Sequence, residues 1–263
     1  MKTKKLFSVA VYAVCTAVMS VGCLKEGEPV DSFSVLSPAV VGESEITGSK
    51  YLSTYSYGAV VPDDVSTLEE YEVGDCASAR FTIDTRKQIE NAPYWIGSGV
   101  RLERVEQTAV LYSEQPEDTT EYSFPIGGAE LHACYTSAFN YNGRLFVNTK
   151  NRIAKTQKVI YSLQCDWSET DENGAYVLCL KGKTIGVEGA LETTESLNAF
   201  DLNAMFDNQN IWKEYVYEDN GKEYKCRSLT LVLKYFTENN KGEPVYNYIN
   251  KSASFTVYLY KEN

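Results

Sequence analysis

Hydrophobic and polar positions alternate along most of the chain, in short runs rich in Val, Ile, Thr, Tyr and Phe. Such runs, separated by polar turns, are typical of β-strands, and no stretch of a dozen residues has the spacing of an amphipathic helix. Apolar residues fall on every second position of two late segments, at Leu229, Leu231, Leu233 and Tyr235 and at Ala253, Phe255, Val257 and Leu259. The polar connection 239–242 returns the chain, so we expect antiparallel pairing there. The pattern predicts an all-β protein.

Three Asn-Gly pairs, at 142–143, 173–174 and 220–221, predict tight hairpins, because both residues tolerate the positive φ angles of a type I′ turn. A two-residue loop also fixes the register of each hairpin. The predicted partners are Phe139 with Phe146 and Tyr141 with Arg144, then Trp167 with Leu180, and finally Tyr217 with Tyr224. In the second hairpin this register places Cys179 opposite Ser168.

The front half of the chain differs from the back half. Its strand candidates are 35–41, 51–61, 75–84 and 100–112, with a loop at 86–98. Residues 113–129 are polar and contain two prolines and several acids, which is typical of a linker. We therefore predict a small β-barrel module at 34–113, a linker at 114–128 and an antiparallel β-sandwich at 129–263.

Residues 1–22 predict an export signal that is not part of the fold. Three lysines precede an uncharged run of 17 residues, Leu6 to Gly22, which is short for a membrane span. The sequence Ser20-Val21-Gly22-Cys23 resembles a bacterial lipobox, in which the cysteine is acylated and becomes the first residue of the mature chain. This predicts lipidation at Cys23; the alternative is an ordinary secreted protein cut near Gly22.

The residues after Cys23 bear on the location of the protein. Leu24 to Glu28 form a charged stretch that resembles the signal by which Bacteroidota send lipoproteins to the cell surface. The alternative is that this stretch is only an ordinary solvated tether. In both cases we place the tether at 23–33. We expect an outer-membrane lipoprotein, held by its lipid anchor and exposed at the cell surface.

The charge of the chain restricts its partners. Lys and Arg number 25 against 36 Asp and Glu, a net charge of −11. Removing residues 1–22 takes away three lysines and no acid, so the mature chain carries 22 − 36 = −14. This charge excludes nucleic acid as an expected partner and disfavours anionic lipid headgroups and acidic glycans.

Five cysteines lie beyond the anchor: Cys76, Cys134, Cys165, Cys179 and Cys226. Their odd number excludes a complete intramolecular disulfide framework, and no Cys-x-x-Cys motif is present. We expect most of them to be buried as small hydrophobic side chains. One bridge between Cys165 and Cys179 stays open as an alternative, although the predicted hairpin register speaks against it.

The sequence yields no catalytic residue, no metal ligand and no cofactor motif. A Ser-His-Asp or Cys-His site would have to use His132, the one histidine, and no nucleophile signature accompanies it. Gly182-Lys183-Thr184 resembles the end of a P-loop, but Val177 stands where the upstream glycine is required. Acids crowd one hairpin tip without the spacing of a calcium loop, so we interpret them as a solvated turn: Asp166, Glu169, Asp171 and Glu172. Paired carboxylates could also hydrolyse glycosides, but no pair stands out.

Aromatic residues suggest where a partner could bind. Tyrosine provides 20 of the 33 aromatic residues. Exposed rings stack on sugars or on partner proteins, and eight candidates fall near predicted loops and strand ends: Tyr51, Tyr55, Tyr57, Tyr94, Trp95, Trp212, Tyr215 and Tyr217. The alternative is that tyrosine is simply common in β-sheets. Separately, Asp118-Thr119-Thr120 resembles the O-glycosylation signal of Bacteroidota, which makes Thr119 a candidate modification site.

Several segments together resemble the NigD-like lipoproteins of Bacteroidota. They are the lipobox at Cys23, the Tyr71 to Cys76 approach to the strand Arg80 to Asp84, the stretch Phe200-Asp201-Leu202, and the strands Leu229 to Tyr235 and Phe255 to Tyr260. The resemblance implies an OB-like barrel for 34–113 and a β-sandwich after it. It implies no activity, and no catalytic residues carry over.

Our leading hypothesis is a non-enzymatic, surface-anchored lipoprotein that binds a protein or glycan partner. The alternatives are a glycan-binding lipoprotein of a polysaccharide-uptake system and a structural accessory of fimbria-like fibres. A fimbrial accessory would need an exposed edge strand. A hydrolase with two carboxylates is a further class.

Overall fold

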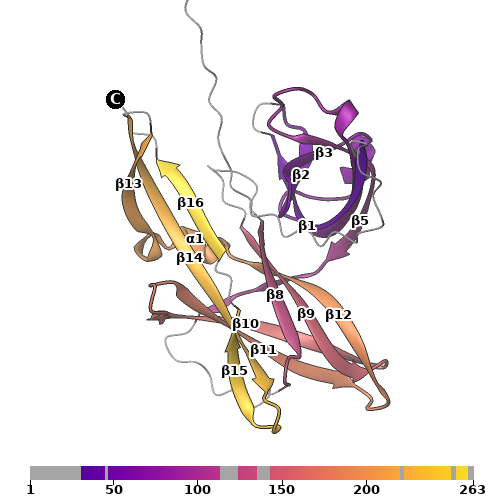
Figure 1. Cartoon of the computed structure of the whole chain (residues 1–263), viewed down its shortest axis with the longest axis vertical. Coiled ribbons are helices and arrows are strands. Elements are labelled where there is room, and N and C mark those ends of the chain that lie inside the picture. The colour runs from indigo at the N-terminus through magenta and orange to yellow at the C-terminus, as the bar shows by residue number, and fades with distance from the viewer. Residues whose placement is uncertain are drawn as a thin grey trace, which may run out of the picture.

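A computed structural model describes residues 31–44, 47–112, 124–134, 143–219, 222–249 and 253–259 (Figure 1). The predicted signal peptide, Cys23 and Thr119 lie outside this part of the chain. The all-β prediction is confirmed. No helix in the described ranges is long and apolar enough to cross a membrane.

The elements follow one another along the chain as β1 (Ser32–Glu43), β2 (Lys50–Thr54), β3 (Gly58–Pro62), η1 (Val65–Leu68), β4 (Cys76–Asp84), η2 (Thr85–Lys87), β5 (Trp95–Val105), β6 (Gln107–Ala109), β7 (Leu111–Tyr112), β8 (Gly128–Cys134), β9 (Arg144–Ala154), β10 (Gln157–Thr170), β11 (Tyr176–Gly186), β12 (Leu191–Asp201), α1 (Asn203–Asp207), η3 (Gln209–Ile211), β13 (Lys213–Asp219), β14 (Lys222–Glu238), β15 (Pro244–Tyr248) and β16 (Ala253–Leu259).

The first five strands close into a barrel in the order β1-β2-β3-β5-β4. β3 and β5 run parallel and the other neighbours antiparallel. The predicted OB-like barrel is therefore confirmed. Small side chains let the interior close: a Cβ at Gly97 would lie 2.8 Å from Val60 Cγ1 and 3.4 Å from Phe81.

Two strand predictions in the front half are wrong. The segment 51–61 is a hairpin of β2 and β3, because Thr54 Oγ1 accepts a hydrogen bond from Tyr57 N and Gly58 adopts a φ of 63°. The segment 100–112 is also broken. β5 ends at Val105, β6 pairs with β12 and β7 pairs with β10. Val110 is buried in the sandwich core, which draws the chain out of the barrel.

The rest of the described chain forms a sandwich of two sheets (Figure 1). One has four strands in the order β6-β12-β9-β8, and the other has seven, β13-β14-β11-β10-β7 with β15 and β16 also paired to β14. Most neighbours are antiparallel, as predicted, whereas β6–β12, β7–β10 and β11–β14 are parallel. Between the sheets lies one apolar core that includes Leu145, Val147, Leu163, Leu178, Leu180, Phe200, Leu231 and Leu233.

The three hairpin predictions have different outcomes. Tyr217 does pair with Tyr224, and β14 does pair antiparallel with β16. The Asn173-Gly174 register is wrong, because Leu180 pairs with Leu163 rather than with Trp167. Asp171 Oδ1 accepts hydrogen bonds from Asn173 N and Ala175 N, which makes a longer loop, and the register shifts again between Cys165 and Thr170.

The Asn142-Gly143 prediction is also wrong. Phe146 pairs with His132 rather than with Phe139, and Arg144 pairs with Cys134. This register places Leu131 beside Val147 in the sandwich core. Burial of these side chains outweighs the local turn preference of Asn-Gly.

The described cysteine side chains form no disulfide: they are Cys76, Cys165, Cys179 and Cys226. Gln164, not Cys165, is opposite Cys179. Cys165 therefore faces the core, and Cys179 points to the opposite face of the sheet. The side chain of Cys134 is not among those described.

Candidate binding surface

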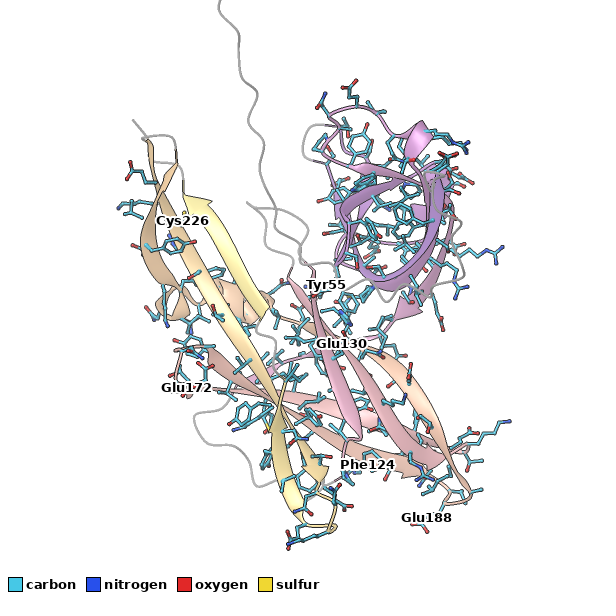
Figure 2. All side chains as sticks on the ribbon, viewed as in Figure 1. Tyr55, Phe124, Glu130, Glu172, Glu188 and Cys226 are labelled. Atoms are coloured by element: carbon cyan, nitrogen blue, oxygen red, sulfur yellow. The ribbon has the colours of Figure 1, made fainter. Side chains whose placement is uncertain are left out.

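His132 lies where the barrel meets the sandwich. Its ring packs edge-on against Tyr55 of the β2–β3 loop, with centroids 4.8 Å apart, and its Nε2 is 3.9 Å from Glu130 Oε2. Figure 2 shows Tyr55 and Glu130 where these two parts of the molecule meet. The histidine thus has a packing role between the two parts of the molecule. Within the described residues, no group of three or more His, Cys, Asp and Glu side chains could hold a metal ion.

At the acidic hairpin tip, the carboxylate of Asp171 accepts hydrogen bonds from the backbone of the turn. The backbone N–H of Ala175 donates to Asp171 Oδ1 at 2.7 Å, and that of Asn173 donates at 2.9 Å. These hydrogen bonds lower the pKa of Asp171, and the one from Ala175 has the largest effect. Glu172 is exposed at the tip (Figure 2), and the side chains of Asp166 and Glu169 are outside the description. The carboxylate of Asp171 therefore closes a loop.

A buried arginine holds the barrel against the sandwich. Arg144 Nη1 donates to Asp201 Oδ1 at 3.1 Å and to Asn203 Oδ1 at 3.2 Å, while its Nε donates to Gln107 Oε1 at 2.6 Å. Gln107 Nε2 in turn donates to Gly74 O of the barrel at 3.1 Å. A guanidinium can be buried only when such partners satisfy it. We call this group, with its apolar neighbours, the junction.

The apolar half of the junction joins residues of both parts: Val40 and Cys76 from the barrel, and Phe146 and Ala199 from the sandwich. Burial raises the pKa of the Cys76 thiol to about 12, although Arg144 opposes this shift. A thiol with this pKa is almost entirely protonated at neutral pH and is a poor nucleophile. Two of the segments that resemble NigD-like proteins, 71–76 and 200–202, meet here, through Cys76 and Asp201.

The predicted aromatic candidates differ in their burial and in their contacts. Trp212 is 8% exposed and belongs to the sandwich core. Tyr57 packs edge-on against both Phe81 and Trp95, so these rings close one end of the barrel. Trp95 and Tyr55 remain partly exposed, at 38% and 45%, but both have internal contacts that explain their position. Tyr215 is exposed on the edge strand β13.

The larger aromatic surface lies elsewhere, where β14 pairs with β15. Phe236 is opposite Tyr246 and Lys234 is opposite Tyr248, so all four side chains lie on one face of the sheet. That face is the outer one, because the alternate residue Leu233 is fully buried in the sandwich core. Figure 1 shows β15 beside the C-terminal half of β14, well away from the barrel. We call these four residues the β14–β15 aromatic surface.

Two neighbouring side chains contact the Tyr246 ring on this surface. The Phe236 and Tyr246 rings are 5.9 Å apart at 70°, an edge-to-face pair, and Lys234 Nζ lies 5.8 Å from the Tyr246 ring centroid. Partial burial raises the pKa of Tyr246, so its hydroxyl is protonated at neutral pH. Tyr246 and Tyr248 are nevertheless 52% and 54% exposed. Two rings thus face solvent without a role in the core.

The sequence prediction missed this surface because it placed no strand between the connection 239–242 and the strand that begins at Ala253. A usable signal was present. Asn239 Oδ1 accepts hydrogen bonds from Lys241 N and Glu243 N, and Gly242 has a φ of 75°, which repeats the Asp171 loop. A five-residue Asx-x-x-Gly-x loop followed by Tyr-x-Tyr predicts a hairpin with both rings on one face.

Comparison with known proteins supports the fold. The chain matches no family model and no curated protein sequence. Its structure resembles that of an uncharacterized protein from Parabacteroides merdae, with 19% identity, a TM-score of 0.60, and coverage of 84% of this chain and 98% of that one. This likeness shows a shared fold.

Two further neighbours come from Bacteroides species. One is a candidate lipoprotein from Bacteroides fragilis, at 9% identity and a TM-score of 0.47, covering 86% of this chain and 98% of that one. The other is a NigD-like immunity protein from Bacteroides caccae, at 12% identity and a TM-score of 0.45, covering 84% and 93%. None of these three is described as an enzyme. A NigD-like protein is thus among the structural neighbours of this chain.

Proposed function

We propose that this chain is a non-enzymatic binding protein, anchored to the outer membrane through an acylated Cys23 and exposed at the cell surface. Its partner, a glycan or a protein, docks on the β14–β15 aromatic surface. The observation that carries this proposal is the pair of exposed rings, Tyr246 and Tyr248, which contribute little to the core. Phe236 and Lys234 contact the Tyr246 ring.

The chemistry of the other candidates supports a binding role. Burial keeps the Cys76 thiol protonated, and His132 packs between Tyr55 and Glu130. Asp171 closes a loop. Each of these groups has a structural role that accounts for its position, whereas the two tyrosines do not.

The edge strand β13 is a weaker candidate for docking. Tyr215 and Val216 are exposed there, and a donor strand could in principle pair with it. However, β13 also carries Lys213, Glu214, Glu218 and Asp219. Charged side chains are the usual protection of an edge strand against pairing. We therefore prefer the β14–β15 aromatic surface to β13 as the docking site. For the same reason we prefer a binding role to that of a fibre accessory.

The proposal is tested by affinity capture from intact outer membranes, with the wild-type lipoprotein and the Tyr246→Ala/Tyr248→Ala variant. The variant should lose the captured partner. Asn247→Ala is the matched control, because Asn247 lies between the two tyrosines and points to the other face of the strand. Equal capture by all three proteins would refute the proposed site.

The anchor and its location need their own test. Cys23→Ala should release the protein from the membrane fraction. Protease added to intact cells should digest the wild-type protein if it is surface-exposed. Protection from protease would place it on the inner face of the membrane and contradict this part of the proposal.

A further inference from the structure

The outside of the barrel carries two arginines that are directly opposite each other. Arg80 of β4 pairs with Arg101 of β5, and Arg80 is also opposite Leu36 of β1. Residues that are directly opposite share a face of the sheet, and this face is the outer one because Val35 and Phe81 are buried in the barrel core. All three side chains are exposed, Leu36 by 64%. We call these three residues the β1–β4–β5 outer patch.

The two arginines of the patch lack the carboxylate partners that the other barrel arginines have. Every residue of β1, β4 and β5 is described, and in the described structure neither the Arg80 nor the Arg101 guanidinium has a hydrogen-bond or ion-pair partner. The other two arginines between 32 and 105 are each paired with an acid: Arg86 with Asp84 and Arg104 with Asp75.

The pairing of Arg80 with Arg101 does not stabilise the barrel. Like charges that are directly opposite on paired strands repel each other. Glu103 lies on the same face but is opposite Ser78, and it makes no ion pair with either arginine in the described structure. The chain contains 36 acids, yet none of those described neutralises this pair. The fold therefore does not account for the two arginines.

The chemistry of the patch fits an acidic segment of another protein. Each guanidinium is a planar fork of N–H donors that can bind one carboxylate through two parallel hydrogen bonds. Neighbouring strands lie about 4.8 Å apart, so the three side chains span roughly 10 Å, more than a single carboxylate can contact. The exposed side chain of Leu36 adds an aliphatic contact beside the charges. Arginine is enriched in protein–protein interfaces and is frequent among the residues on which their affinity depends.

We propose that the β1–β4–β5 outer patch docks an acidic segment of a partner protein, with carboxylates on Arg80 and Arg101 and an apolar side chain on Leu36. Charge complementarity favours an acidic partner. The aliphatic Leu36 favours a protein, because an acidic glycan offers charge without an aliphatic group. The inference goes beyond the proposed function, since the barrel lies well away from β15 and the β14–β15 aromatic surface (Figure 1).

The test measures the binding of two acidic polypeptides to the full-length lipoprotein in detergent micelles, with binding to empty micelles subtracted. One probe is poly-L-glutamate and the other is a copolymer of glutamate and leucine with the same number of carboxylates. The wild type should bind the copolymer more tightly than poly-L-glutamate. The Arg80→Gln/Arg101→Gln variant should bind both polymers roughly fivefold more weakly, since it loses two exposed ion pairs. Leu36→Ser should abolish the preference for the copolymer.

Matched variants control for charge and for apolar surface. Arg152→Gln/Lys155→Gln removes the same charge from exposed sites on the sandwich and should bind like the wild type. Val187→Ser removes another exposed aliphatic side chain and should keep the preference for the copolymer. The Tyr246→Ala/Tyr248→Ala variant should also bind the copolymer normally, so the failure of one proposal leaves the other testable.

Thermal unfolding shows whether the two arginines serve the fold instead. The Tm of Arg80→Gln/Arg101→Gln should be unchanged or up to about 3 °C higher, because the variant removes a repulsive pair. A Tm that falls by more than this amount would give the arginines a structural role and overturn the inference.

The binding outcomes decide between the possible occupants of the patch. Copolymer binding that is weakened in Arg80→Gln/Arg101→Gln and kept in Arg152→Gln/Lys155→Gln supports the inference. Equal weakening in both variants, or no binding of either polypeptide, would overturn it. Tighter binding of heparin than of the copolymer would make the ligand a sulfated glycan and overturn the protein partner. A wild-type dimer in sedimentation velocity that the arginine variant loses would make a second copy of this chain the occupant instead.

Discussion

The junction and the β14–β15 aromatic surface use similar side chains in opposite ways. At the junction, Arg144 and Phe146 are buried, and Asp201 and Gln107 from other strands satisfy the guanidinium. On the aromatic surface, Lys234 Nζ lies 5.8 Å from the Tyr246 ring centroid, yet more than half of the tyrosine is exposed. Solvent exposure without a role in the core is what separates the two regions.

The largest effect is expected at the apolar half of the junction. Phe146→Ala removes a fully buried ring from between Val40 and Ala199. We expect a loss of about 3–5 kcal/mol in the free energy of unfolding, from lost burial and the cavity left behind. Urea unfolding monitored by fluorescence would measure it. A loss below 1 kcal/mol would mean that the barrel and the sandwich do not stabilise each other there.

The second largest loss of stability is expected at the polar half of the junction, the Arg144 network. Arg144→Met keeps the apolar length and leaves Asp201, Asn203 and Gln107 without their common partner, so we expect a loss of about 2–3 kcal/mol. Arg152→Met, an exposed position on the same strand, is the control and should change the stability by less than about 0.5 kcal/mol. Equal losses in the two variants would contradict the role of the buried network.

Thiol reactivity can test how far the buried junction and the outer sheet face differ in solvent accessibility. Cys76 is fully buried and its pKa is raised to about 12, so alkylation at pH 8 should modify it only after unfolding. Cys179 is half-buried on the outer sheet face and should react earlier in the native protein. Mass spectrometry of peptides after timed iodoacetamide treatment reads out both sites. Rapid native labelling of Cys76 would show that the junction opens.

The smallest effect on stability is expected at the aromatic surface itself. Tyr246→Ala/Tyr248→Ala removes rings that are mainly exposed, so the free energy of unfolding should fall by no more than about 1 kcal/mol. The same variant should lose its partner. A large loss of stability would show that the rings serve the fold and would weaken the contrast drawn here.

The sequence predicted the architecture better than the connections. Alternation of apolar residues identified the strands, because this alternation marks a strand whichever partner residues it pairs with. The resemblance implied the OB-like barrel. The Asn-Gly signal predicted one register of three. It failed at 173–174 because Asp171 makes a longer loop, and at 142–143 because burial of Leu131 and Val147 fixes the pairing.

The candidate site was harder to predict than the fold. Local sequence shows that Tyr246 is aromatic, but its exposure depends on where β15 pairs along β14. Trp95 and Trp212, which were predicted candidates, contribute to the barrel end and the sandwich core instead. The Arg144 network joins residues far apart in the chain, at 107, 144, 201 and 203, and no short motif encodes it.

The most direct test of the central claim is photo-crosslinking on intact cells, with a photoreactive phenylalanine analogue in place of Tyr248. The comparison position is Tyr215, an exposed tyrosine on the edge strand β13. We predict that the probe at 248 yields a specific adduct, with glycan or with protein, and that the probe at 215 yields none. An adduct at 215 alone, or at neither position, would contradict the claim that the exposed rings of β15 hold the partner.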